Sequence, residues 1–144
     1  MSLFTYVDTS GLAKRFWREP GTDIVLRAFE DAKAIATVSL SYVELISATF
    51  RAARRGDVPS ADVPRVLEAI RDEWKDYVRL PVDDDIIQQA ASLTQRHAIR
   101  AYDAVHLAAA LKWQAELGET IGFLVFDQEL AKAGAAEGLT TIPG

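Results

Sequence analysis

Residues 3–10 read Leu-Phe-Thr-Tyr-Val-Asp-Thr-Ser, an apolar run that ends abruptly in an acid. The β-branched and aromatic residues of Leu3 to Val7 are typical of a buried strand. Ser10 is then a candidate N-cap for a helix that stops at Pro20-Gly21. This pattern predicts a strand that leads directly into a helix, with Asp8 at the carboxyl end of the strand.

The same alternation of short apolar runs and helical segments continues to the end of the chain. Further strands are predicted at Ala34 to Val38, Val78 to Val82, Gly122 to Phe126 and Leu139 to Ile142. Helices are predicted from Ser39 or Ser41 to Arg55, from Ser60 to Tyr77, from Asp83 past Leu93, from Ala101 to Glu116, and from Asp127 to Gly138. Because parallel strands need crossover connections, the alternation predicts a three-layer α/β fold with a parallel sheet of about five strands.

Length and composition fit a single domain over residues 1–144. Apolar residues make up 49% of the chain and charged residues 26%, which excludes disorder and a coiled coil. The absence of cysteine excludes disulfides and thiolate chemistry and fits a reducing compartment. No window approaches the roughly 18 apolar residues of a membrane span, and no secretory leader is visible. We therefore expect a cytoplasmic protein that does not enter membranes.

The net charge of -5 argues against a protein that coats nucleic acid by bulk electrostatics. It does not exclude one that processes nucleic acid, because several basic residues are grouped. Arg51, Arg54 and Arg55, on one predicted helix, are candidates for an RNA path, although a solvated helix face explains such a group equally simply.

Four acids from distant parts of the chain are predicted to meet at one edge of the sheet. Asp8 and Asp127 follow the first and fourth strands, and Glu44 and Asp103 lie in the first turns of helices. In open α/β sheets, ligands bind beyond the carboxyl ends of the strands, which is where these side chains begin. Helix capping by Asp127 and a favourable helix dipole at Asp103 remain alternative explanations for these two positions.

The neighbours of these acids favour a metal site. Glu44 lies within Tyr-Val-Glu-Leu-Ile and Asp103 beside Tyr102, with no obvious basic partner. Carboxylates in apolar surroundings repel one another unless a cation neutralises them, and a set of oxygen ligands alone favours Mg²⁺ or Mn²⁺ over Zn²⁺. A metal that activates water for phosphodiester hydrolysis is the chemistry this pattern indicates, with one or two ions.

Other polar and aromatic side chains near these segments have a structural role as the simpler explanation beside a functional one. Ser10 could hold a metal-bound water or a phosphate, as well as capping a helix. His106 lies one turn after Asp103, where packing at the helix surface is the expected role. Three tryptophans invite a base-stacking role, but packing is the expectation for each: Trp17, Trp74 and Trp113.

Four ordered segments resemble the PIN-domain ribonucleases, and among them the VapC toxins of VapBC toxin–antitoxin pairs. The segments are Tyr6-Val-Asp-Thr-Ser-Gly-Leu-Ala-Lys, Ser41-Tyr-Val-Glu-Leu, Ala101-Tyr-Asp-Ala-Val-His-Leu-Ala-Ala-Ala and Val125-Phe-Asp-Gln-Glu-Leu, the last followed by Ala-Glu-Gly-Leu. Because they are distributed from the start to the end of the sequence, the resemblance covers essentially the whole chain. The resemblance implies that Asp8 and Asp103 are the principal metal ligands, with Glu44 and Asp127 completing the site. It also implies RNA as substrate, a cognate VapB-like antitoxin and a homodimer. Many members carry Thr or Ser where this chain has Val125, which removes a hydroxyl near the predicted site.

Several other functions remain open at this stage. A PIN nuclease of RNA maturation or DNA flap processing would carry the same four acids. The presence of all four acids argues against a PIN fold used only as a binding module. A receiver-like phosphoacceptor would need adjacent acids after the first strand, where Thr9-Ser10 follow Asp8. A haloacid-type phosphatase would need a second Asp in place of Ser10.

Overall fold

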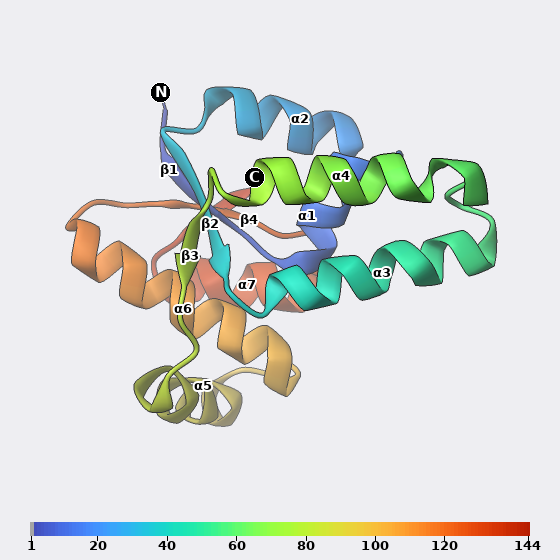
Figure 1. Cartoon of the computed structure of the whole chain (residues 1–144). Helices are drawn as coiled ribbons and strands as arrows, with labels where there is room; N and C mark the ends of the chain where they lie inside the picture. Colours follow the sequence, from blue (N-terminus) through green and yellow to red (C-terminus); the bar gives the residue numbers. More distant parts are fainter. Residues whose placement is uncertain (1) are drawn as a thin grey trace.

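The computed structural model describes residues 2–144 and places five strands in one parallel sheet, in the order β3-β2-β1-β4-β5 (Figure 1). The strands are β1 Phe4–Val7, β2 Ala34–Val38, β3 Val78–Leu80, β4 Gly122–Leu124 and β5 Thr140–Ile142. On the central strand β1, Tyr6 is paired with Ala36 on one side and Phe123 on the other. The chain adds β2 and β3 on one side of β1 and then crosses to add β4 and β5, so strand order reverses at β1. Ligands of such sheets bind at this reversal.

The helices cover both faces of the sheet, which confirms the predicted three-layer architecture. They are α1 Thr9–Phe16, α2 Thr22–Asp31, α3 Ser41–Arg55, α4 Val63–Trp74, α5 Asp84–Arg96, α6 Ala101–Leu117 and α7 Gln128–Ala136. One core cluster joins the sheet to α1–α4 through residues such as Leu12 and Leu45, and a second joins it to α5–α7 through residues such as Leu107 and Leu130. No helix of residues 2–144 is long and apolar enough to cross a membrane.

Helix α2 was absent from the sequence prediction. Ile24 and Val25 are β-branched, and the segment contains no side-chain cap that would mark its start. The helix instead begins after Gly21, which adopts a positive φ of 97°, and it buries Thr22, Val25 and Ala28 at intervals of three residues. This burial pattern, rather than local propensity, stabilises α2.

The predicted caps were partly wrong. Asp8, not Ser10, caps α1, because its carboxylate accepts a hydrogen bond from the backbone N–H of Gly11. Helix α3 starts at Ser41, one of the two predicted starts, although neither Ser39 nor Ser41 caps it through its side chain.

Other helix ends agree with the prediction more closely. The segment predicted as one helix from Ser60 to Tyr77 is a 3-10 turn, Ser60–Asp62, followed by α4, which ends at Trp74. The helix predicted to begin at Asp83 is α5, and the Asp83 side chain caps it by accepting the Ile86 N–H. Gly56 and Gly118 end α3 and α6 in the left-handed conformation.

Candidate active site

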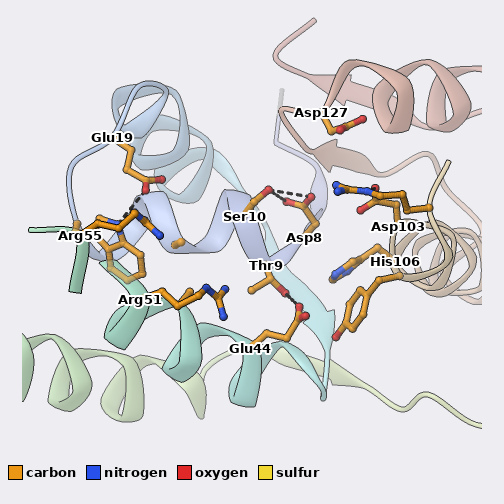
Figure 2. Close-up of a pocket in the computed structure, with 15 residues that line it drawn as sticks. Asp8, Thr9, Ser10, Glu19, Glu44, Arg51, Arg55, Asp103, His106 and Asp127 are labelled. Carbon is orange, nitrogen blue, oxygen red and sulfur yellow. Dashed lines mark hydrogen bonds and ion pairs between the residues drawn. The ribbon is translucent and has the colours of Figure 1, made fainter. Parts of the chain in front are cut away.

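The four predicted acids line one cavity at the carboxyl edge of the sheet, about 630 Å³ in volume (Figure 2). Asp8 directly follows β1, and Asp127 follows β4 after two further residues. Glu44 and Asp103 come from the first turns of α3 and α6. The convergence predicted from parallel strand ends is therefore present in the structure.

Asp8 is the most buried of the four, with 4% of its surface exposed. Its Oδ1 accepts the Gly11 N–H at 2.9 Å, and the Ser10 hydroxyl lies 3.3 Å from Oδ1 and 3.2 Å from Oδ2. Burial raises the pKa of Asp8 to about 6, the two hydrogen-bond donors lower it, and the charges of Asp103 and Asp127 raise it further. Asp8 therefore carries a charge that its surroundings only partly stabilise.

Charge repulsion connects Asp8 with Asp103 and Asp127, and Asp103 with Asp127 and Glu44. Burial raises the pKa of Asp103, the Arg100 guanidinium opposes this, and the charges of Asp127 and Glu44 reinforce it. Asp127 caps α7 through Oδ1, which accepts the Leu130 N–H at 2.9 Å. The capping role of Asp127, which was the alternative explanation for this position, is therefore present in the structure. The second oxygen of Asp127, Oδ2, forms no hydrogen bond within the described residues.

The donor set fits a hard divalent cation. Five carboxylates line the cavity, the four predicted acids and Glu19. Among the four predicted acids, only Asp103 has a cationic partner within the described residues, Arg100 at 3.5 Å. In their present conformations, no three acidic or histidine side chains of residues 2–144 are placed to share one ion. Asp103 is turned toward Arg100 and Glu44 toward Thr9, so these two half-buried side chains would have to change rotamer to share one ion. Burial, reinforced by the charges of neighbouring carboxylates, raises the pKa of both Asp8 and Asp103, and a bound cation would stabilise their ionised forms.

Thr9 is a site residue that the sequence analysis missed. Its hydroxyl lies 2.8 Å from Glu44 Oε1 and 3.2 Å from the Ser41 hydroxyl, which in turn lies 2.7 Å from that of Thr37. Ser41 and Thr37 are completely buried. Because a hydroxyl has only one proton to donate, Thr9 donates it to Glu44, the partner with the shorter distance and the negative charge. The position of Thr9, next to Asp8 at the helix start, was the available signal.

The basic residues separate into two groups. Arg51 and Arg55 line the cavity, and so does Arg100, whereas Arg54 does not. Glu44, Ala48, Arg51 and Arg55 follow one another at helical spacing on α3 and share the face toward the cavity. Two of the three arginines predicted to lie along an RNA path therefore line the cavity, and RNA binding by them stays a prediction.

His106 is a core residue rather than the surface residue expected from the sequence. It is 2% exposed, and its Nδ1 lies 2.6 Å from the Tyr6 hydroxyl in the middle of β1. Burial lowers the pKa of His106 to about 3, so the ring is neutral at physiological pH. Val125 is also buried in the core and does not line the cavity.

Comparison with known proteins agrees with this architecture. A family model described as the PIN domain matches residues 5–135. The chain belongs to the PIN domain family. A relative, "Ribonuclease VapC45" of Mycobacterium tuberculosis, is 29% identical over 106 residues, which are 74% of each chain.

Two solved structures share the fold. Mycobacterium tuberculosis VapC20, described as a sarcin-ricin loop cleaving toxin, superposes with a TM-score of 0.65 at 20% identity, over 90% of this chain and 95% of that one. A toxin–antitoxin complex from Klebsiella pneumoniae gives a TM-score of 0.62 at 16% identity, over 88% of this chain and 90% of that one. The predicted fold and family are thereby confirmed.

Proposed function

We propose that this PIN domain protein is a Mg²⁺- or Mn²⁺-dependent endoribonuclease that acts as the toxin of a toxin–antitoxin pair. The observation that carries the proposal is the buried carboxylate of Asp8, which faces the charges of Asp103 and Asp127 in one cavity. Because burying an unpaired carboxylate lowers the free energy of unfolding, a neutral side chain at this position would make the protein more stable, and a charge kept there is expected to have a function. Curated relatives named as VapC ribonucleases support RNA as the substrate.

Asp8 and Asp103 would hold the ion, with Glu44 and Asp127 binding it directly or through water. When bound, the ion would lower the pKa of a water molecule and neutralise charge on the scissile phosphate. Arg51 and Arg55 line the same cavity and would bind flanking phosphates. Ser10 donates to Asp8 and would stabilise its ionised form.

Asn substitutions at Asp8 and Asp103 test the proposal. Each should abolish Mg²⁺- or Mn²⁺-dependent cleavage of single-stranded RNA while the circular dichroism spectrum stays that of a folded protein. Asp31→Asn is the matched control, because Asp31 is exposed at the end of α2 and outside the cavity. Full cleavage by both variants would show that these acids are not the catalytic site.

Metal binding has a separate test that does not depend on activity. A ligand bound only by the folded state raises the melting temperature as its concentration rises. Mg²⁺ should therefore raise the melting temperature of the wild type and of Asp31→Asn, and raise that of Asp8→Asn much less. No change in the wild type up to about tens of millimolar, the order of magnitude for weak sites, would exclude a metal site here.

The proposed partners are RNA, a second copy of the chain and a cognate VapB-like antitoxin, in the cytoplasm. Exposed apolar side chains on α3, Val43 and Phe50, are candidates for protein contacts. A small open reading frame directly upstream that encodes a DNA-binding antitoxin would distinguish a toxin from a PIN nuclease of RNA maturation. When the two proteins are co-expressed, that antitoxin should co-purify with this chain and inhibit its cleavage of RNA.

A further inference from the structure

The active-site cavity extends well beyond the four carboxylates. Its far end is lined by Trp17 and Glu19 from the segment after α1, and by Arg51 and Arg55 from α3. Figure 2 shows Glu19 and Arg55 on the side of the cavity away from Asp103. The volume of about 630 Å³ lies in the range of pockets that enclose a whole organic ligand. There is room for a nucleotide next to the one that is cleaved.

Trp17 differs from the other two tryptophans, for which the structure confirms packing roles. Trp113 is 7% exposed in the core, and Trp74 lies between Tyr42 and Tyr77, with ring centroids 5.2 and 5.8 Å away. Trp17 is half-buried, packs against the core and also lines the cavity. An aromatic ring fixed in the wall of a nucleic-acid cavity is a stacking surface for a base.

Glu19 is held in the same wall by its neighbours. The Trp17 indole N–H donates to Oε2 at 3.1 Å, and the Lys14 ammonium lies 3.4 Å from Oε1. The Glu19 backbone N–H and the Thr22 hydroxyl oxygen, 2.9 Å apart, fix the main chain. A carboxylate can accept about four hydrogen bonds, so each oxygen retains an unused acceptor position. Glu19 is therefore a pre-positioned double acceptor.

The arginines of this end leave Glu19 available. Arg51 donates to the Ser47 hydroxyl at 2.7 Å and Arg55 to Asp57 at 3.0 Å, and among the described residues neither forms an ion pair with Glu19. Both contacts are exposed, so both guanidinium groups can exchange them for phosphate oxygens at little cost. Arg51 can then hold the phosphate that links the far end of the cavity to the cleaved bond.

We propose that this end of the cavity is a nucleobase subsite that selects guanine, with Trp17 stacking on the base and Glu19 accepting its N1–H and N2–H. The inference rests on the proposed ribonuclease function. Among RNA bases, guanine alone presents two adjacent donors on its Watson–Crick edge, which match the two oxygens of one carboxylate. Adenine and cytosine offer one amino group beside a ring acceptor, and uracil offers one N–H between two carbonyls, so each would place an acceptor against Glu19. Single-stranded bases are read along this edge.

Cleavage of a randomised single-stranded RNA pool, followed by sequencing of the product ends, tests the subsite. The wild type should enrich guanine at one fixed position near the cut, and Glu19→Gln should still cleave but lose that enrichment. Trp17→Ala should lower kcat/KM about tenfold, within the cost of losing one base–aromatic stack. Glu68→Gln is the matched control for charge, because Glu68 is exposed on α4 and outside the cavity. Cleavage without guanine enrichment, or with enrichment retained by Glu19→Gln, would overturn the subsite and leave the nuclease function standing.

A binding measurement decides the subsite without cleavage. Asp8→Asn should bind a uridine heptamer with one central guanine about tenfold more tightly than the same heptamer with inosine, which lacks the 2-amino group. Adding Glu19→Gln should remove the difference. Equal affinities in the Asp8→Asn protein would overturn the proposal. If the wild type cuts no RNA, the ribonuclease function fails, and the comparison of guanine with inosine still tests the subsite.

Discussion

Replacing Asp8 with asparagine should make the metal-free protein more stable at neutral pH and slightly less stable in acid. The carboxylate is buried and ionised in the native state at neutral pH, while in the unfolded chain it is fully hydrated. Asparagine has nearly the same shape and can still accept the Gly11 N–H that caps α1. The Ser10 hydroxyl oxygen, 3.2 Å from Oδ2, can accept a hydrogen bond from the new amide.

The magnitude follows from the pKa of Asp8, which burial, followed by neighbouring charge, raises from 3.8 to about 6. Each unit corresponds to about 1.4 kcal/mol, so the two-unit shift lowers the free energy of unfolding by about 3 kcal/mol at most. Between pH 4 and 6 the native state holds a proton that the unfolded state has lost, so stability falls as the pH rises through this window. The loss is complete above about pH 6 and absent below about pH 4.

Urea unfolding in EDTA, followed by circular dichroism, measures this effect at several pH values. Asp8→Asn should exceed the wild type by about 2 kcal/mol at pH 7.5, after about 1 kcal/mol is subtracted for an imperfectly bonded amide. Near pH 4, where the charge gain is absent, it should be less stable than the wild type by that same amount of about 1 kcal/mol. Asp31→Asn should follow the wild type throughout. A variant that is no more stable than the wild type at pH 7.5, or whose advantage persists unchanged at pH 4, would refute the account of Asp8 as an uncompensated charge.

Two further predictions concern the cavity walls. Replacing both Arg51 and Arg55 with Gln should reduce the slope of log Kd for RNA against log salt concentration by about 1.4, which is about 0.7 for each lost phosphate contact. Arg54→Gln should leave this slope unchanged, because Arg54 does not line the cavity. Equal effects of the three substitutions on the slope would contradict the separation of these arginines on α3. Thr9→Val should lower kcat about tenfold through loss of the 2.8 Å hydrogen bond to Glu44, with Thr9→Ser restoring it in steady-state cleavage assays. A fully active Thr9→Val would show that Glu44 needs no such support.

The positions of the four acids could be predicted because parallel strands end at a common edge. The approximate ends of β1 and β4 are enough to place Asp8 and Asp127 at this edge, and the starts of α3 and α6 are enough to place Glu44 and Asp103 there. Arg54 could have been separated from its neighbours by the same reasoning. Glu44, Arg51 and Arg55 share one helical face, and Arg54 falls off it.

Features that depend on tertiary contacts could not be predicted in this way. Helix α2 is stabilised by burial of Val25 and Ala28 against the sheet, while its β-branched residues favour a strand locally. The hydrogen bond between Tyr6 and His106 joins residues that are 100 positions apart in the sequence. The residues next to His106 are buried at almost every position, so the local sequence pattern does not show whether the imidazole faces the core or the solvent. The cap of α1 was assigned to Ser10 because serine is a common N-cap, although Asp8 was equally suited and nearer the strand end.

The burial of Asp8 at the end of the central strand has an evolutionary consequence. Most core substitutions are removed by selection because they unfold the protein. A substitution that neutralises Asp8 would inactivate the proposed site and stabilise the fold, so a lineage that no longer needs the activity meets no folding barrier to losing it. Persistence of an aspartate at such a position in a population is therefore a sign that the activity itself is being selected.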